Sequence, residues 1–98
     1  MKKATVFYMI GCPYCESAKR AVQALKQEDE RIAALDIEWI DENRQNALAS
    51  QYDYDDVPSI FSGKKKLYEA QPGQKDAEIK ESVRKALLLA YADDEPAV

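Results

Sequence analysis

The chain lacks histidine altogether, and acidic residues outnumber basic ones to give a net charge of −4. Without histidine, the sequence has no Cys-His nucleophile pair, no imidazole general base and none of the commonest metal ligands. The negative charge argues against nucleic acid as a partner, because nucleic-acid binding needs a basic surface. It also argues against anionic membrane surfaces, and no apolar run is long enough to cross a bilayer. Any chemistry must therefore use cysteine, carboxylate, lysine or tyrosine side chains.

Cysteine is also scarce, and the two cysteines stand three positions apart as Cys12 and Cys15. Two thiols cannot complete a four-ligand zinc site on their own. A half-site completed by carboxylates or by a second chain stays open as an alternative, but we expect no bound metal. The spacing of the pair is therefore the first candidate for a functional signal.

The length and composition predict one folded domain. The chain has 98 residues, of which 46% are hydrophobic and 33% charged, as in globular proteins. The first apolar run, residues 4–10, lies at the lower limit for the hydrophobic part of a secretory signal, so we interpret it as a buried strand. We expect a cytoplasmic protein with a single domain over residues 1–92 and a frayed tail over residues 93–98.

The hydrophobic periodicity predicts alternating strands and helices. A helix should begin at Pro13 and fade in the charged run "KQEDER", and Gly63 should form a hairpin turn. Asp76 should cap a last helix. The predicted order is β-α-β-α-β-β-α, a mixed four-stranded sheet with helices on both faces. The further expected elements are a strand at residues 36–41, a short helix within residues 42–54, a strand after Pro58 and a strand at residues 66–70.

The cysteine pair has the context of a redox site. Proline suits the first position of a helix, so Pro13 places Cys12 at the N-cap. The positive end of the helix dipole stabilises thiolate there, and Cys15 follows one turn later on the same side. We predict that Cys12 is the more acidic and more exposed thiol, which attacks a disulfide, and that Cys15 resolves the mixed disulfide. The alternative is a pair of buried structural cysteines, but a Cys-x-x-Cys motif that opens a helix after a strand favours redox chemistry.

The segment "CPYC" resembles the active-site motif of glutaredoxins, and the element order over residues 4–91 resembles the thioredoxin fold. In that superfamily a cis-proline faces the active-site disulfide and presents backbone to the substrate. "Val57-Pro58" followed by "SIF" resembles this loop. The resemblance implies that Val57 and Pro58 contact the substrate, together with Pro13, which fixes the turn, and Tyr14, which offers an aromatic surface.

Several residues depart from the glutaredoxin pattern. Met9 stands where glutaredoxins usually carry a lysine that meets glutathione. Their Gly-Gly pair is missing, and an ungapped count from Pro58 reaches Tyr68 and Glu69 instead. The segment at residues 53–56, here called the acidic turn, carries three aspartates that would repel glutathione, although a solvated turn explains them equally well. We therefore expect weak glutathione binding and no tightly bound cofactor.

The second half of the chain is more similar to thioredoxins, with a tyrosine, a turn and a proline in "QYDYDDVPSI". Gly73 lies where thioredoxins place a glycine before the last helix. However, Gly11 replaces the tryptophan of the thioredoxin motif, and Val6 occupies the approximate place of a buried aspartate. The sequence therefore combines a glutaredoxin-like motif with a thioredoxin-like body.

These observations predict a thiol-disulfide oxidoreductase that reduces protein disulfides through Cys12 and Cys15. Its partners would be a disulfide-containing protein and an electron donor, either glutathione or a flavoprotein reductase, and we expect a monomer. Two other classes stay open. One is an iron-sulfur carrier in which two chains bridge a cluster through Cys12, and the other is a non-catalytic redox sensor.

Overall fold

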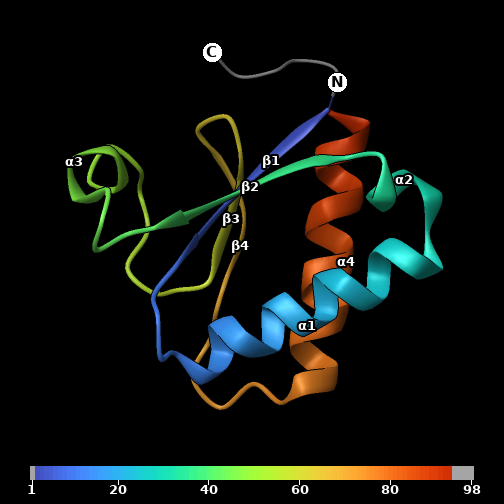
Figure 1. Cartoon of the computed structure of the whole chain (residues 1–98), viewed down its shortest axis with the longest axis horizontal. Helices are drawn as coiled ribbons and strands as arrows, with labels where there is room; N and C mark the ends of the chain where they lie inside the picture. Colours follow the sequence, from blue (N-terminus) through green and yellow to red (C-terminus); the bar gives the residue numbers. More distant parts are fainter. Residues whose placement is uncertain (1, 94–98) are drawn as a thin grey trace.

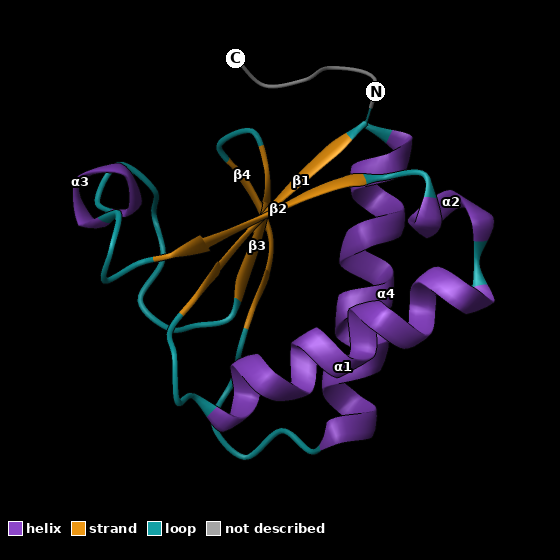
Figure 2. Ribbon diagram, viewed as in Figure 1, coloured by secondary structure: helices purple, strands orange, loops and turns teal. Residues whose placement is uncertain are grey.

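The computed structural model describes residues 2–93, which form strands and helices in alternation (Figures 1 and 2). The elements are β1 (Lys3–Tyr8), α1 (Pro13–Glu28), α2 (Glu30–Ala33), β2 (Asp36–Asp41), α3 (Asn46–Ala49), β3 (Ser59–Ser62), β4 (Lys65–Glu69) and α4 (Asp76–Ala92). Apart from α2, this is the predicted order. The predicted frayed tail lies outside the described residues except for Asp93.

The four strands form one mixed sheet in the order β2-β1-β3-β4. Strands β1 and β2 are parallel, with Val6 opposite Trp39, and β3 is antiparallel to both β1 and β4. Gly63 has a φ of +58° in the turn that joins β3 to β4, as its place in the sequence predicted. The mixed sheet with helices on both faces confirms the predicted fold class and is compatible with a thioredoxin-like fold.

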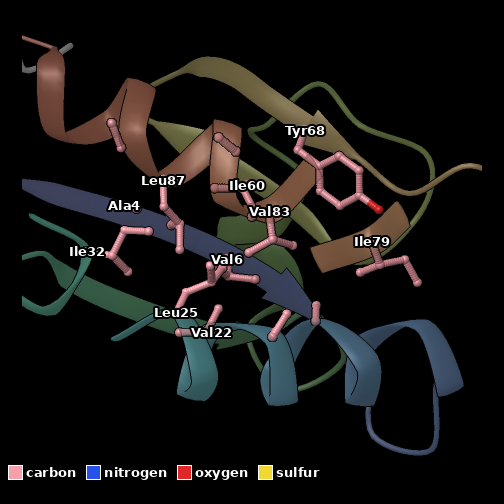
Figure 3. Packing of buried hydrophobic residues seen from close by; sticks show 14 of the residues in the cluster. Ala4, Val6, Val22, Leu25, Ile32, Ile60, Tyr68, Ile79, Val83 and Leu87 are labelled. Atoms are coloured by element: carbon pink, nitrogen blue, oxygen red, sulfur yellow. The ribbon is translucent and has the colours of Figure 1, made fainter. Parts of the chain in front are cut away.

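The larger core lies between the sheet and the helices α1 and α4, which cover the same face (Figure 1). In Figure 3, Val6 of β1 points toward Val22 and Leu25 of α1 and toward Val83 of α4. All four side chains are buried, and burial of each such side chain contributes roughly 1.5–3 kcal/mol. This packing fixes α1 against the sheet, with Cys12 directly before the helix and Cys15 in its first turn.

A smaller aromatic core covers the opposite face, under the segment that contains α3. The ring of Phe7 stacks on Tyr54 with a centroid distance of 5.0 Å and meets Phe61 edge-on at 5.7 Å. Tyr52 contacts both phenylalanines. Offset and edge-on ring pairs are the favoured aromatic geometries, so this cluster holds the connection that leads from β2 to Pro58.

Three local expectations were wrong. Strand β1 ends at Tyr8 rather than Ile10, because the chain turns there and leaves Ile10 73% exposed. The charged run does not simply end α1: the Asp29 carboxylate accepts a hydrogen bond from the Arg31 N–H at 2.9 Å and starts α2. Asp76 is the first residue of α4 rather than its cap, which is Lys75.

None of the helices over residues 2–93 is long and apolar enough to cross a membrane.

Candidate active site

The turn between β1 and α1 places Cys12 at the start of the helix. Gly11 has a φ of +84°, a conformation that side chains with a Cβ rarely adopt, and this explains glycine at that position. The predicted N-cap is confirmed: Cys12 is extended, with φ of −90° and ψ of 116°, and Pro13 begins α1. The carbonyl of Cys12 accepts the first helical hydrogen bond, from the Glu16 N–H at 3.0 Å.

The two cysteines lie together, and both are free thiols. The backbone N–H of Cys15 donates to the Sγ of Cys12 at 3.3 Å, so the sulfur takes the capping role that a serine or aspartate oxygen usually has. Cys12 is 8% exposed and Cys15 is 2% exposed. Cys12 is therefore the more exposed thiol, as predicted, although both are largely covered.

The environments of the two sulfurs differ in charge stabilisation as well as in exposure. Burial raises the pKa of the Cys15 thiol to about 12, and its hydrogen bond with Cys12 adds to the rise. An N–H group at a helix start stabilises a negative charge on the Cys12 sulfur. Cys15 is therefore held in its protonated form at neutral pH.

The loop before β3 brings Val57 and Pro58 to the cysteines. The Sγ of Cys12 donates to the carbonyl oxygen of Val57 at 3.8 Å, although the two residues are 45 positions apart. The Val57-Pro58 peptide bond is cis, which confirms the expectation from the resemblance. Pro58 is fully buried, and its carbonyl accepts from the Ala70 N–H at 3.0 Å. The loop is therefore anchored beside the Cys12 sulfur.

The side chain of Tyr14 reaches the loop between β4 and α4. Its hydroxyl accepts a hydrogen bond from the Gly73 N–H at 2.7 Å, and its ring packs against the larger core. We expected an aromatic surface beside the sulfur. The structure adds a structural role, because this bond ties the start of α1 to the residues before α4. The two partners are 59 positions apart, so no local sequence signal could have revealed the bond.

The acidic turn is held by Glu69, a residue that sequence reasoning did not connect with it. One carboxylate oxygen of Glu69 accepts from the N–H groups of Asp55 and Asp56, each at 2.7 Å. The other oxygen pairs with the Nζ of Lys66 at 2.7 Å. Glu69 thus fixes the backbone directly before Val57.

The positions that the resemblance connects with glutathione have other surroundings here. Tyr68 and Glu69 belong to strand β4 rather than to a helix start. The glycine in the loop before α4 is Gly73, with a φ of +84°. At the start of α4, the carboxylate of Asp76 accepts from the Ser17 hydroxyl at 2.7 Å. A carboxylate of the protein itself therefore already lies at this helix N-terminus.

On strand β1, Val6 is fully buried, as its place on the strand predicted. The negative charge of the Glu42 carboxylate also raises the pKa of the Cys15 thiol, but less than burial does. Glu42 follows β2 and accepts from the Tyr54 hydroxyl at 2.7 Å. No motif or periodicity in the sequence indicated that this residue belongs near the site.

Neither a known protein family nor a curated protein matches the chain in sequence. The part of the chain that the structure describes holds no group of three or more His, Cys, Asp or Glu side chains arranged to bind a metal. The arrangement can support thiol chemistry, since it joins an N-capping sulfur, a second thiol one turn away and a facing loop.

Proposed function

We propose that the protein is a thiol-disulfide oxidoreductase of the glutaredoxin and thioredoxin type that reduces protein disulfides with both cysteines. The hydrogen bond from the Cys15 N–H to the Cys12 Sγ supports this proposal most directly. It favours negative charge on one sulfur while burial disfavours it on the other. A structural pair of buried cysteines would not need this difference.

In the proposed reaction, the thiolate of Cys12 attacks one sulfur of the substrate disulfide. A Cys12–substrate disulfide forms, and the other substrate sulfur leaves as a thiolate that takes up a proton. Cys15 then loses its proton and attacks the Cys12 sulfur, which releases the second substrate thiol. The substrate gains two electrons and two protons, and the protein is left with a Cys12–Cys15 disulfide.

The substrate would bind along the loop at Val57 and Pro58. Among the described residues the Val57 N–H has no hydrogen-bond partner, so this group and its carbonyl can pair with an extended peptide. Pro13 and Tyr14 flank the sulfur on the helix side. Glu69 supports this assignment indirectly, because it holds the backbone immediately before Val57.

Regeneration needs an electron donor, and a flavoprotein reductase fits the site better than glutathione does. Met9 offers no positive charge, and Asp76 already lies at the start of α4. The acidic turn would repel the negative charge of glutathione. We place this dithiol cycle in the cytoplasm, where thiols are kept reduced.

The test is to trap the mixed disulfide. A Cys15→Ser variant mixed with an oxidised protein substrate should form one adduct through Cys12 and then stop, because the internal resolving thiol is gone. A Cys12→Ser variant is the matched control and should form no adduct. Non-reducing electrophoresis and mass spectrometry detect the adduct and identify the linked cysteine.

Three outcomes would contradict the proposal. An adduct through Cys15 would reverse the assigned roles, and no adduct with any oxidised protein would refute the enzyme proposal in favour of a sensor. Full multiple turnover of Cys15→Ser with glutathione would refute the dithiol mechanism. It would also restore the case for a glutathione enzyme or a glutathione-dependent iron-sulfur carrier.

A further inference from the structure

A hollow of about 380 Å³ lies at the edge of the sheet, beside the carboxyl ends of β1 and β2. Its lining consists of Tyr8, Trp39, Asp41, Arg44 and Gln45. Neither cysteine lines it, and neither does Val57. It is therefore a separate feature from the candidate active site, and the dithiol cycle assigns it no task.

Two aromatic side chains form one wall of the hollow. Tyr8 is the last residue of β1, and Trp39 lies on the neighbouring β2, opposite Val6. Their rings meet edge-on, with centroids 6.0 Å apart and an interplanar angle of 77°. Both side chains are half-buried, so part of each ring stays accessible. Such a wall favours an apolar group of a ligand.

Two opposite charges line the same hollow without neutralising each other. Asp41 is 7% exposed, and its Oδ1 accepts from the Asn43 N–H at 2.9 Å. Within residues 2–93 its Oδ2 has no hydrogen-bond or ion-pair partner, although a carboxylate can accept several bonds. Arg44 is exposed and forms no ion pair with Asp41 or with another carboxylate in that range.

The turn after β2 brings the backbone of these residues together. The carbonyl of Asp41 accepts from the N–H groups of Arg44 and Gln45, at 3.1 and 3.0 Å. The backbone thus places a carboxylate, a guanidinium and a side-chain amide within one short turn beside the aromatic wall. A carboxylate with an accessible, unused oxygen favours a cationic group, and a guanidinium favours a carboxylate.

We propose that this hollow binds a small zwitterion with an apolar side chain, of the class of free α-amino acids. Its ammonium group would donate to Asp41 and to the amide oxygen of Gln45. Its carboxylate would pair with the guanidinium of Arg44, and its apolar chain would lie against Tyr8 and Trp39. The volume is at the small end of ligand sites, which suits a molecule of this size.

The experiment uses the fluorescence of Trp39, the single tryptophan of the chain, so that the signal comes from the hollow itself. L-norleucine is the probe, and n-pentylamine and hexanoate are matched analogues that lack its carboxylate or its ammonium group. We expect a saturable change with norleucine. Each analogue should bind at least about tenfold more weakly than norleucine, because it loses one charge-assisted contact.

Three variants complete the test. Asp41→Asn keeps an oxygen for the Asn43 N–H but removes the charge, and Arg44→Gln removes the cation from an exposed position. Both should weaken norleucine binding about tenfold or more. Lys26→Gln, an exposed charge in the last turn of α1, is the matched control and should leave the affinity unchanged.

Several results would overturn the proposal. One is the absence of a saturable signal with norleucine in the unmodified protein. Another is binding of n-pentylamine as tight as that of norleucine, which would indicate a simple cation site. If Asp41→Asn does not fold, Arg44→Gln decides, and unchanged norleucine affinity in that variant refutes the proposal. None of these results depends on whether the cysteines catalyse disulfide exchange.

Discussion

Alkylation of the reduced protein should distinguish the two thiols sharply. Burial is the main cause that raises the pKa of Cys15, from an ordinary value of 9.0 to about 12. At any pH well below 9.0, this rise lowers the fraction of Cys15 present as thiolate about a thousandfold. Since the thiolate is the reactive form, Cys15 should react slowly with iodoacetamide.

Part of that loss is offset by nucleophilicity. A more basic thiolate attacks faster, with a Brønsted slope of about 0.4–0.5, which returns a factor of roughly 15 to 30 over three pKa units. Cys15 should therefore react roughly 30 to 60 times more slowly than a thiol of ordinary pKa. Its 2% exposure should slow the reaction further. We expect Cys12 to be labelled before Cys15.

The assay is timed labelling at several pH values, followed by mass spectrometry of the peptides that carry each cysteine. A Cys12→Ser variant is the control. It replaces the Cys12 thiol by a hydroxyl and leaves the main effect, the burial of Cys15, unchanged, so Cys15 should stay slow. Equal labelling of the two thiols in the unmodified protein, or faster labelling of Cys15, would refute the reasoning.

Two further predictions concern charge around the site. Met9→Lys should raise activity in a glutathione-disulfide assay by up to about tenfold, whereas Met9→Gln, similar in length but uncharged, should not; ordinary glutaredoxin efficiency before substitution would contradict this prediction. Glu69→Gln should lower the free energy of unfolding by roughly 1–3 kcal/mol at neutral pH, measured by urea denaturation, with the exposed Glu38→Gln as a control that costs less than about 1 kcal/mol. The hydrogen bond from Lys66 lowers the pKa of Glu69. The ionised Glu69 carboxylate therefore stabilises the fold fully above the ordinary pKa of 4.5, and this stabilisation is lost as pH falls through the lowered pKa. If the difference in free energy of unfolding between the unmodified protein and Glu69→Gln grew as pH falls, this assignment would be contradicted.

Much of the site near Cys12 could be predicted from local sequence. Proline after Cys12 fixes the first helical residue, and this alone puts the sulfur at the N-cap. The alternating and apolar segments also located the strands, with β2 matched at both ends. The charged run before β2 misled the prediction, because it contains a new helix cap at Asp29 as well as a helix end.

The rest of the site depends on contacts between residues far apart in the chain. The bond of Tyr14 to Gly73, the support of the acidic turn by Glu69 and the meeting of Tyr8 with Trp39 all need the finished sheet. Side chains of any of these types could equally have faced solvent. Their partners are fixed by strand order and register, which local patterns do not specify.

The sequence by itself determined the Cys-x-x-Cys spacing, the helix that begins beside it and the alternation of strands and helices, because these follow from dihedral preferences and periodicity within a few residues. Only the tertiary structure decided how deeply Cys15 is buried, and this burial is the main reason that its pKa rises. It also decided which carbonyl faces the Cys12 sulfur and which charges share the hollow beside β2. Burial and electrostatic environment arise when α1 packs on the sheet, and they are properties of the assembled core rather than of any segment.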